Sequence, residues 1–214
     1  LLDRVLPIIM GQGYQIDLND LRFKYDFQFD PVDENTYKHI SWPQGHVVEG
    51  EPVTLRDYQV EIINKYLATP HCLQEIATGA GKTLITAALS NKVEKYGRSI
   101  VIVPNKDLVT QTYADYANLG LDVGVYYGDK KQLGHTHTIC TWQSLNSIRK
   151  RYKEGESELS LAEFADGVVC VIVDEVHQAK AEVLKDLLTK EFSNIPLRWG
   201  LTGTIPKADH EKVS

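Results

Sequence analysis

From residue 54 onward, short apolar runs alternate with longer segments in which apolar residues recur every three or four positions. This pattern predicts helices over residues 54–68, 82–96, 106–119 and 181–189. It predicts strands over residues 72–76, 99–103, 122–127, 138–140, 168–173 and 197–201. Val168–Val173 is apolar at every position, which is typical of a central parallel strand covered on both faces. Alternating strands and helices indicate an α/β fold with a doubly wound parallel sheet.

Residues 1–50 follow a different pattern. Leu21–Phe29 alternates strictly between apolar and polar residues, which predicts a half-buried strand. Leu1–Met10 is apolar and predicts short helical pieces, limited by a proline at position 7. Residues 41–53 hold two prolines and two glycines, which is typical of a linker. We therefore expect a small α+β N-terminal accessory region and linker over residues 1–50, and one α/β domain over residues 51–214.

The composition is that of a globular protein. The 214 residues are 43% hydrophobic and 24% charged, with a mean hydropathy of −0.27, so the chain can bury a core without disulfide or metal staples. No apolar run approaches the ~20 residues of a membrane-spanning helix. The 23 basic and 29 acidic residues give a net charge of −6, which argues against a histone-like positive surface but does not exclude nucleic-acid binding through a local patch.

Three widely spaced cysteines, Cys72, Cys140 and Cys170, form no CxxC pair. The spacing argues against a zinc ribbon or a disulfide framework, and fits a reducing compartment. The N-terminus lacks the basic and apolar regions of a signal peptide, so we expect a cytoplasmic protein. Because the chain begins with Leu1 and holds a single methionine, Met10, we expect it to be a piece of a longer protein.

A candidate phosphate-binding loop, Ile76–Thr83 (IATGAGKT), lies between a predicted strand and a predicted helix. Gly79 and Gly81 permit a tight turn whose N–H groups converge on phosphate oxygens. Lys82 supplies a charge for the β and γ phosphates, and Thr83 offers its hydroxyl to Mg²⁺. The first position of the pattern is isoleucine where glycine is usual. The alternative is a simple glycine turn before a helix.

Two acidic residues follow the apolar run Val168–Val173 directly. Two unpaired buried carboxylates would be costly, so Asp174 and Glu175 are expected at the open end of the strand or beside a cation. Asp174 is the candidate Mg²⁺ partner, and Glu175 is placed to polarise an attacking water. The alternative is a strand that ends in a solvated acidic turn. Together with the phosphate loop, the pair indicates hydrolysis of MgATP or MgGTP.

Six segments in this order make the chain resemble the first motor domain of superfamily 2 DExH helicases and translocases. They are 55–59 (LRDYQ), 77–83 (ATGAGKT), 103–111 (VPNKDLVTQ), 141–145 (TWQSL), 174–177 (DEVH) and 201–204 (LTGT). The first, second and fourth are most similar to the branch that holds UvsW-type phage helicases, XPB and restriction-enzyme motors. The resemblance covers about residues 55–204 and implies a RecA-like P-loop fold. More loosely, residues 1–50 resemble the accessory domain of UvsW-type enzymes.

The resemblance implies a role for each matching residue, with ATP and Mg²⁺ as cofactors. The implied nucleotide-binding residues are Arg56, Gln59, Thr78, Gly79, Ala80, Gly81, Lys82 and Thr83. Gln59 would read the adenine edge, and Thr83 and Asp174 would hold Mg²⁺. The implied catalytic residues are Lys82, Asp174, Glu175 and His177, of which His177 would relay the nucleotide state. Thr202, Gly203 and Thr204 would couple hydrolysis to the grip on nucleic acid. Taken alone, Gln59 could be a helix-surface residue, His177 structural and the threonines part of a turn.

The resemblance also implies contacts with the nucleic-acid backbone, which carry no sequence code. They fall on Pro104, Asn105, Gln111, Thr141 and Gln143. Pro104 and Asn105 precede a predicted helix whose free N–H groups can bind a phosphate.

Three further features have competing interpretations. The basic stretch Arg149–Lys153 could steer DNA, but acidic residues follow it, which favours a solvated surface helix and loop. The aromatic residues of 21–29 could stack on bases, but their two-residue spacing favours a role in the core. His135, His137 and Cys140 hint at a metal site without an evident fourth ligand.

We therefore expect an ATP-dependent DNA helicase or translocase that unwinds or remodels branched DNA in recombination, repair or replication. Its partners would be DNA and a second RecA-like domain elsewhere in the same protein, and its location the host cytoplasm if a phage encodes it. The alternatives are a restriction-enzyme motor subunit, an RNA-directed DExH helicase, a small-molecule kinase and a non-catalytic module that keeps ATP as a structural ligand. We further expect the 214-residue chain alone to hydrolyse ATP poorly, because a second domain would supply the arginine that stabilises the transition state.

Overall fold

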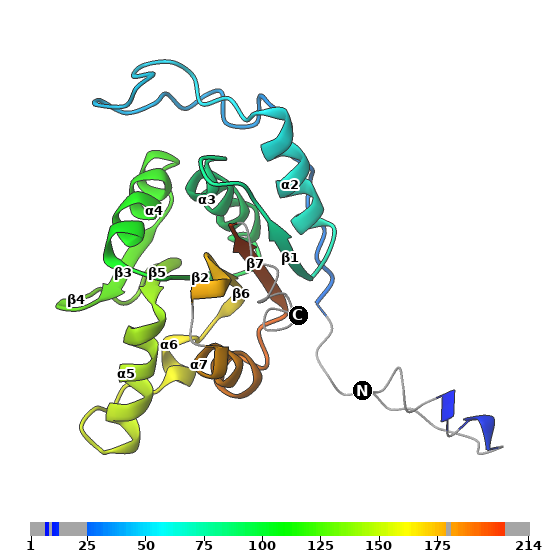
Figure 1. Ribbon diagram of the computed structural model, residues 1–214, viewed down its shortest axis with the longest axis vertical. Coiled ribbons are helices and arrows are strands. Elements are labelled where there is room, and N and C mark those ends of the chain that lie inside the picture. Colours follow the sequence, from blue (N-terminus) through cyan, green and yellow to red (C-terminus); the bar gives the residue numbers. More distant parts are fainter. Residues whose placement is uncertain (1–6, 9, 13–24, 179–180, 204–214) are drawn as a thin grey trace.

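Seven strands form one sheet in the order β1-β7-β6-β2-β5-β3-β4 (Figure 1). The computed structural model describes residues 7–8, 10–12, 25–178 and 181–203. The strands are β1 (His71–Glu75), β2 (Arg98–Val103), β3 (Val123–Tyr127), β4 (Lys130–Lys131), β5 (His137–Thr141), β6 (Val168–Val173) and β7 (Leu197–Thr202). Neighbouring strands are parallel except for the short antiparallel pair β3–β4. The predicted doubly wound parallel sheet is therefore confirmed.

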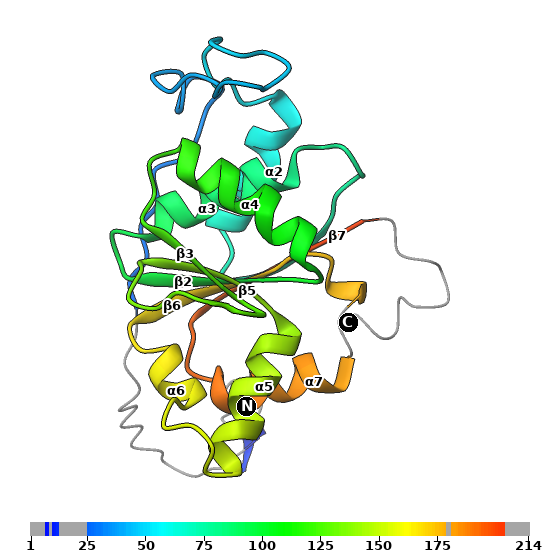
Figure 2. The same ribbon diagram turned by 90° about the vertical axis from the view of Figure 1, so that its left-hand side faces the viewer.

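Helices cover both faces of the sheet (Figure 2). The helices α2 (Asp57–Leu67), α3 (Lys82–Val93) and α4 (Lys106–Asn118) lie on one face. The helices α5 (Trp142–Lys153), α6 (Leu161–Phe164) and α7 (Ala181–Asp186) lie on the other. A 3₁₀ turn, η1 (Val176–Gln178), follows β6, and a π-helical turn, η2 (Leu187–Glu191), follows α7. An apolar core thus lies on each face of the sheet. Strand β6 is buried at all six positions and contributes side chains to both cores.

Most predicted elements are present, and the differences have local causes. The helix predicted from residue 54 begins at Asp57, because Arg56 is extended and its N–H donates to Gln59 Oε1 at 2.9 Å. Most of α5, together with α6 and β4, was not predicted, since polar residues dominate the α5 sequence and the other two are only four and two residues long.

The prediction that residues 149–153 form a solvated surface is wrong for Arg149. The side chain of Arg149 is 13% exposed, and its guanidinium pairs with Glu191 at 2.6 Å and with Asp186 at 3.9 Å. These pairs fasten α5 to α7 and η2. Lys150 and Arg151 are exposed, as expected.

The strand predicted over residues 21–29 is wrong for residues 25–29, and residues 21–24 lie outside the described residues. Residues 25–29 form no strand. The rings of Tyr25, Phe27 and Phe29 stack in a row with centroids 5.1 and 5.8 Å apart. Phe27 and Phe29 each pack nearly perpendicular to the ring of Tyr96, whose hydroxyl bonds with the backbone of Gln28. The apolar alternation is therefore satisfied by packing on the core, and not by pairing in a sheet.

Residues 41–53, which were predicted to be a linker, contain a hairpin. Ser41 pairs with Pro52, the Trp42 N–H donates to Glu51 O at 2.9 Å, and the Gly50 N–H donates to Trp42 O at 3.0 Å. We call residues 41–52 the cleft hairpin. Within it, the rings of Trp42 and His46 stack at 4.2 Å. The helical pieces expected in residues 1–10 lie mostly outside the described residues.

Two other features of composition can be placed in the fold. Cys140 and Cys170 are buried, Cys72 is partly buried, and all three thiols are free. In the part of the chain that the structure describes, no helix has the length and apolar character needed to cross a membrane.

Candidate active site

The phosphate loop joins β1 to α3 at the carboxyl edge of the sheet, where ligands of doubly wound folds bind. The Ile76 N–H donates to Thr202 O at 2.7 Å, and its side chain is 2% exposed in the core. An apolar residue therefore occupies the first position of the loop because that position packs inward. Gly79 and Gly81 have φ angles of 82° and 75°, which only glycine adopts without strain.

Lys82 begins α3 and faces the two carboxylates at the end of β6. Its Nζ forms an ion pair with Glu175 and lies 4.0 Å from Asp174 Oδ1. The three side chains are between 2% and 15% exposed. The structure thus brings together the three residues that the sequence predicted for phosphate binding and hydrolysis, and compensates the buried negative charge with one cation.

The backbone of β6 and the turn after it position both carboxylates. The Asp174 N–H extends the ladder to Ile102 O at 2.9 Å, which buries the Asp174 side chain in the floor of the site. Burial raises the pKa of Asp174 to about 6, opposed by the charges of Lys82 and His177. Among the described residues, Glu175 is the one non-glycine with a positive φ, 50°. This left-handed conformation costs about 1–2 kcal/mol and turns the Glu175 carboxylate back toward the loop.

The segments DEVH and LTGT meet beside these carboxylates. The Nδ1 of His177 lies 2.7 Å from Thr202 Oγ1 and 3.4 Å from Glu175 Oε2. The Gly203 N–H donates to Glu175 Oε2 at 3.2 Å. His177, predicted to relay the nucleotide state, and Thr202 and Gly203, predicted to couple hydrolysis to the grip on nucleic acid, therefore contact one another or Glu175. The fourth, Thr204, lies outside the described residues.

Sequence reasoning missed Asp115, which lies on α4. The Thr83 hydroxyl donates to Asp115 Oδ2 at 2.5 Å. Burial raises the pKa of Asp115, while the Thr83 hydrogen bond and the charge of His46 oppose the rise. No local signal could have found this residue, because an aspartate on an amphipathic helix is ordinary and the contact joins residues 32 positions apart.

The phosphate loop opens into a cleft of about 420 Å³. Its walls come from the loop (Gly79–Gly81, Thr83, Leu84), from α2 and its approach (Thr54, Arg56, Tyr58, Gln59), from Asp115, and from the cleft hairpin (Trp42, His46, Val48, Glu51, Pro52). The hairpin contribution was not predicted, since residues 41–53 read as a linker. Proximity to a phosphate loop makes this cleft the candidate place for the base and sugar of a nucleotide.

Gln59 is 5% exposed and is hydrogen-bonded within the protein. Its Oε1 accepts from the Arg56 N–H, and its Nε2 donates to Ala80 O at 3.1 Å. The predicted adenine-reading residue therefore also anchors the phosphate loop to α2. Arg56 lines the same cleft, and its guanidinium donates to the Tyr58 hydroxyl at 3.2 Å.

The residues predicted to contact nucleic acid follow β2 and β5, which are neighbours in the sheet. Val103 pairs with Thr141 in register, and Gln143 Nε2 donates to Pro104 O at 3.5 Å. Asn105 and Thr141 use their side-chain oxygens as helix N-caps, accepting from Leu108 N–H and Ser144 N–H. Thr141 is 8% exposed, whereas Asn105, Gln111 and Gln143 are exposed. The strand order places this group next to the carboxylates, on the side away from the phosphate loop.

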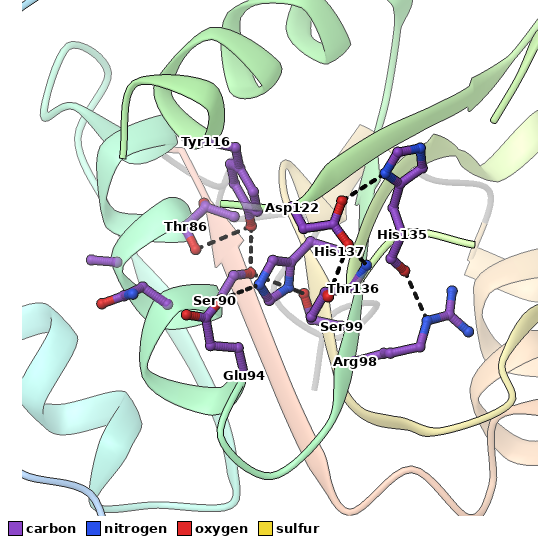
Figure 3. A network of polar contacts seen from close by, with 12 residues as sticks. Thr86, Ser90, Glu94, Arg98, Ser99, Tyr116, Asp122, His135, Thr136 and His137 are labelled. Atoms are coloured by element: carbon purple, nitrogen blue, oxygen red, sulfur yellow. Dashed lines mark hydrogen bonds and ion pairs between the residues drawn. The ribbon is translucent and has the colours of Figure 1, made fainter. Parts of the chain in front are cut away.

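His135 and His137, the two histidines of the candidate metal site, have other partners at the amino ends of the strands (Figure 3). His137 bonds with Ser99 Oγ at 2.7 Å and Glu94 Oε2 at 3.0 Å, and His135 bonds with Asp122 at 2.8 Å. Within the described ranges, no three His, Cys, Asp or Glu side chains are arranged to hold a metal ion. A Mg²⁺ ion that completes its shell with nucleotide phosphates and water needs fewer protein ligands, and the oxygen donors of Thr83 and Asp174 fit that requirement.

A family model described as "Type III restriction enzyme, res subunit" matches residues 52–207. The chain belongs to this family. Two curated relatives are the DNA 3'-5' translocase XPB2 of Sulfurisphaera tokodaii and the DNA 3'-5' helicase XPB of Mycobacterium tuberculosis. The first is 28% identical over 183 residues, which are 85% of this chain and 36% of the relative. The second is 29% identical, over 79% of this chain and 32% of the relative. The chain thus spans about a third of the length of both.

Solved structures share the fold. The UvsW helicase from bacteriophage T4 has a TM-score of 0.69 at 16% identity, over 99% of this chain and 73% of that chain. The Sulfolobus solfataricus SWI2/SNF2 ATPase core, solved in complex with dsDNA, has a TM-score of 0.52 at 21% identity, over 86% of this chain and 36% of that chain. Membership of the res-subunit family, with these relatives, confirms the predicted first motor domain of a superfamily 2 helicase and its RecA-like fold.

Proposed function

We propose that this chain is the ATP-hydrolysing half of a DNA helicase or translocase that remodels branched DNA. The observation that carries the proposal is the convergence of Lys82, Asp174 and Glu175 at the mouth of the phosphate loop. The family and the XPB relatives support an ATP-driven motor that acts on DNA.

In this proposal the residues divide the work of hydrolysis. Lys82 exchanges its carboxylate partners for the β and γ phosphates when ATP enters. Glu175, released from Lys82, accepts a proton from the attacking water. Thr83 and Asp174 would hold Mg²⁺, which, when bound, neutralises phosphate charge. Arg56, Gln59 and the cleft hairpin would hold the adenosine end.

Coupling to nucleic acid follows the carboxyl edge of the sheet. His177 contacts both Thr202 and Glu175, so a change at the phosphates reaches the turn after β7. We place the second RecA-like domain of the full-length protein over this turn, where it would complete the site. The exposed side chains of Asn105, Gln111 and Gln143, with the helix that Thr141 caps, would hold the DNA backbone. We also place the protein in the cytoplasm, in keeping with its three free cysteines.

The name of the family supports one second candidate, the motor subunit of a restriction enzyme. Such a subunit would hydrolyse ATP at this same site. A nuclease domain in the full-length protein, with ATP-dependent cleavage of DNA, would decide for it.

The test is steady-state ATP hydrolysis by the full-length protein with no nucleic acid, single-stranded DNA, branched DNA or RNA. We expect DNA to stimulate turnover, and Lys82→Ala to abolish it. Lys92→Ala, on the same helix but away from the loop, is the matched control and should keep the wild-type rate. Glu175→Gln should lose turnover by at least ~100-fold while it still binds ATP and DNA.

Other outcomes would select other functions. Rates indifferent to every nucleic acid would reject the motor. Stimulation by RNA alone would select an RNA-directed helicase. Phosphoryl transfer to an acceptor would identify a kinase, and full biological function of Glu175→Gln would identify a module that keeps ATP as a structural ligand.

A further inference from the structure

A polar pocket of about 220 Å³ lies between one face of α5 and the strand pair β3–β4. We call it the basic pocket. It is lined by Tyr126, Gly128, Lys131, Gln143, Ser144, Ser147, Ile148, Arg151 and Ser157. Two of these side chains are cations, five carry amide or hydroxyl donors, and none is a carboxylate. In a chain with a net charge of −6, such a lining selects an anion.

The two cations belong to opposite walls of the basic pocket. Lys131 lies on β4 with its Nζ 5.9 Å from the ring centre of Tyr126, which is 6% exposed. Arg151 lies on α5, and its one ionic neighbour among the described residues is Glu156 at 3.9 Å. Both side chains of that pair are about half exposed, so the pair is weak and an incoming phosphate can displace it.

The structure separates the basic stretch 149–153 into residues with different partners. Arg149 is bound to Glu191 and Asp186, and Lys150 pairs with Glu154. Arg151 instead shares one face of α5 with Gln143 and Ser147, because four-residue steps return to the same side of a helix. Of the stretch 149–153, Arg151 is the residue that lines the basic pocket.

The basic pocket continues the row of residues predicted to hold nucleic acid. Gln143 and Ser144 belong both to the TWQSL segment and to the pocket. The bond from Gln143 to Pro104 O connects the pocket to the start of α4. Gly128, directly after β3, closes the other side. A DNA strand that lies over the carboxyl ends of β2 and β5 would therefore reach the basic pocket next.

We propose that the basic pocket binds one backbone phosphate of the DNA strand, through Lys131 and Arg151. The guanidinium can donate two parallel hydrogen bonds to a phosphate, and the serine hydroxyls can supply more. The site takes phosphodiester oxygens and reads no base, which suits a motor that moves along any sequence. The proposal rests on the function proposed above, because it presumes that DNA crosses this edge of the sheet.

The experiment uses the full-length protein and short fluorescent DNA at salt concentrations from 50 to 200 mM. Lys131→Gln, Arg151→Gln and the double variant each remove pocket charge. Lys150→Gln is the matched control, since it removes the same charge from the same helix outside the pocket. We expect each pocket variant to weaken DNA binding about 5–10-fold, and the double variant to lower the slope of log affinity against log salt by ~0.7–0.9. Thermal unfolding should stay at the wild-type temperature in all four.

Four results would overturn the inference. If the wild type binds DNA but the pocket variants match Lys150→Gln in DNA affinity and salt slope, the pocket proposal is overturned. The proposed function is then unaffected. A general loss of folding in Arg151→Gln but not in Lys131→Gln, with DNA affinity of Lys131→Gln unchanged, would show a structural role. Saturable binding of inorganic phosphate that Arg151→Gln abolishes, with DNA affinity unchanged, would assign the pocket to a free anion. Failure of the wild type to bind any DNA would reject the proposed function as well.

Discussion

Asp115 Oδ2 accepts a hydrogen bond of 2.5 Å from the Thr83 hydroxyl, which joins α4 to the phosphate loop. Because the hydroxyl hydrogen is held by Asp115, the oxygen lone pairs of Thr83 are left for another ligand. Helix α4 begins at Lys106, directly after its N-cap Asn105, and both Asn105 and Gln111 are predicted DNA backbone contacts. One helix therefore has a nucleotide-site residue and a candidate DNA-contact residue on it.

Asp115 should matter for binding of MgATP more than for binding of ATP. We expect Asp115→Ala to weaken nucleotide binding in Mg²⁺ about 10-fold, a size typical for loss of a group that orients a metal ligand. Binding in EDTA should change little, and Asp115→Asn should restore part of the loss because its amide oxygen accepts the same bond. Fluorescent-nucleotide titration measures both, with Asp166→Ala as control, because Asp166 is exposed and precedes the amino end of β6. Equal losses with and without Mg²⁺ would show that the contact only supports the loop.

Asp174 should reduce stability at neutral pH when no ligand is bound. Its folded pKa of about 6 lies above that of an unfolded aspartate, so the folded state holds the proton more tightly between about pH 4 and 6. The free energy of unfolding therefore falls as pH rises through this window. Above the window, Asp174 causes no further change with pH. The shift corresponds to at most ~3 kcal/mol.

The variant Asp174→Asn tests this prediction. Without nucleotide or Mg²⁺ at pH 7, we expect it to unfold with a free energy ~1–2 kcal/mol higher than wild type, because the amide needs no charge compensation and still accepts from the Glu175 N–H. The gain should vanish near pH 4, as urea titrations at both pH values would show. A variant less stable than wild type at pH 7 would mean that the Lys82 contact outweighs the cost of burial.

Gly81 is required for its conformation and for the approach of Gln59. A Cβ at Gly81 would lie 2.6 Å from Gln59 Nε2, whereas a Cβ at Gly79 would meet nothing within 4 Å. Both positions have positive φ angles, so each alanine costs ~1 kcal/mol of backbone strain. Urea titration should therefore show a larger loss for Gly81→Ala than for Gly79→Ala. Adding Gln59→Ala should remove the excess, and an excess that persists in the double variant would contradict the assigned clash.

His177 should affect coupling more than nucleotide affinity. We expect His177→Ala to reduce the stimulation of ATP hydrolysis by DNA ~10-fold or more, because the bond to Thr202 and the contact with Glu175 are both lost. ATP affinity should stay within about twofold of wild type. His71→Ala, an exposed histidine at the start of β1, is the control. A large loss of ATP affinity with normal stimulation would assign His177 to nucleotide binding.

The sequence alone determined the α/β class and the strands from β1 to β7 apart from β4, and it predicted the loop and the carboxylates of the candidate ATP site. These are properties of neighbouring residues: a six-residue apolar run, glycines before Lys82, and acids directly after a buried strand. Burial and backbone geometry act over a few positions there, so the pattern carries the information.

Only the tertiary structure decided which distant residues meet. It brought Asp115 to Thr83, tied Arg149 to Glu191, and folded residues 41–52 against the cleft. It also left residues 25–29 outside the sheet, because the rings of Phe27 and Phe29 pack against Tyr96. Each contact joins residues far apart along the chain, and its free energy depends on how whole elements pack. That packing is set by the sheet order and the helix faces together, and no local period encodes it.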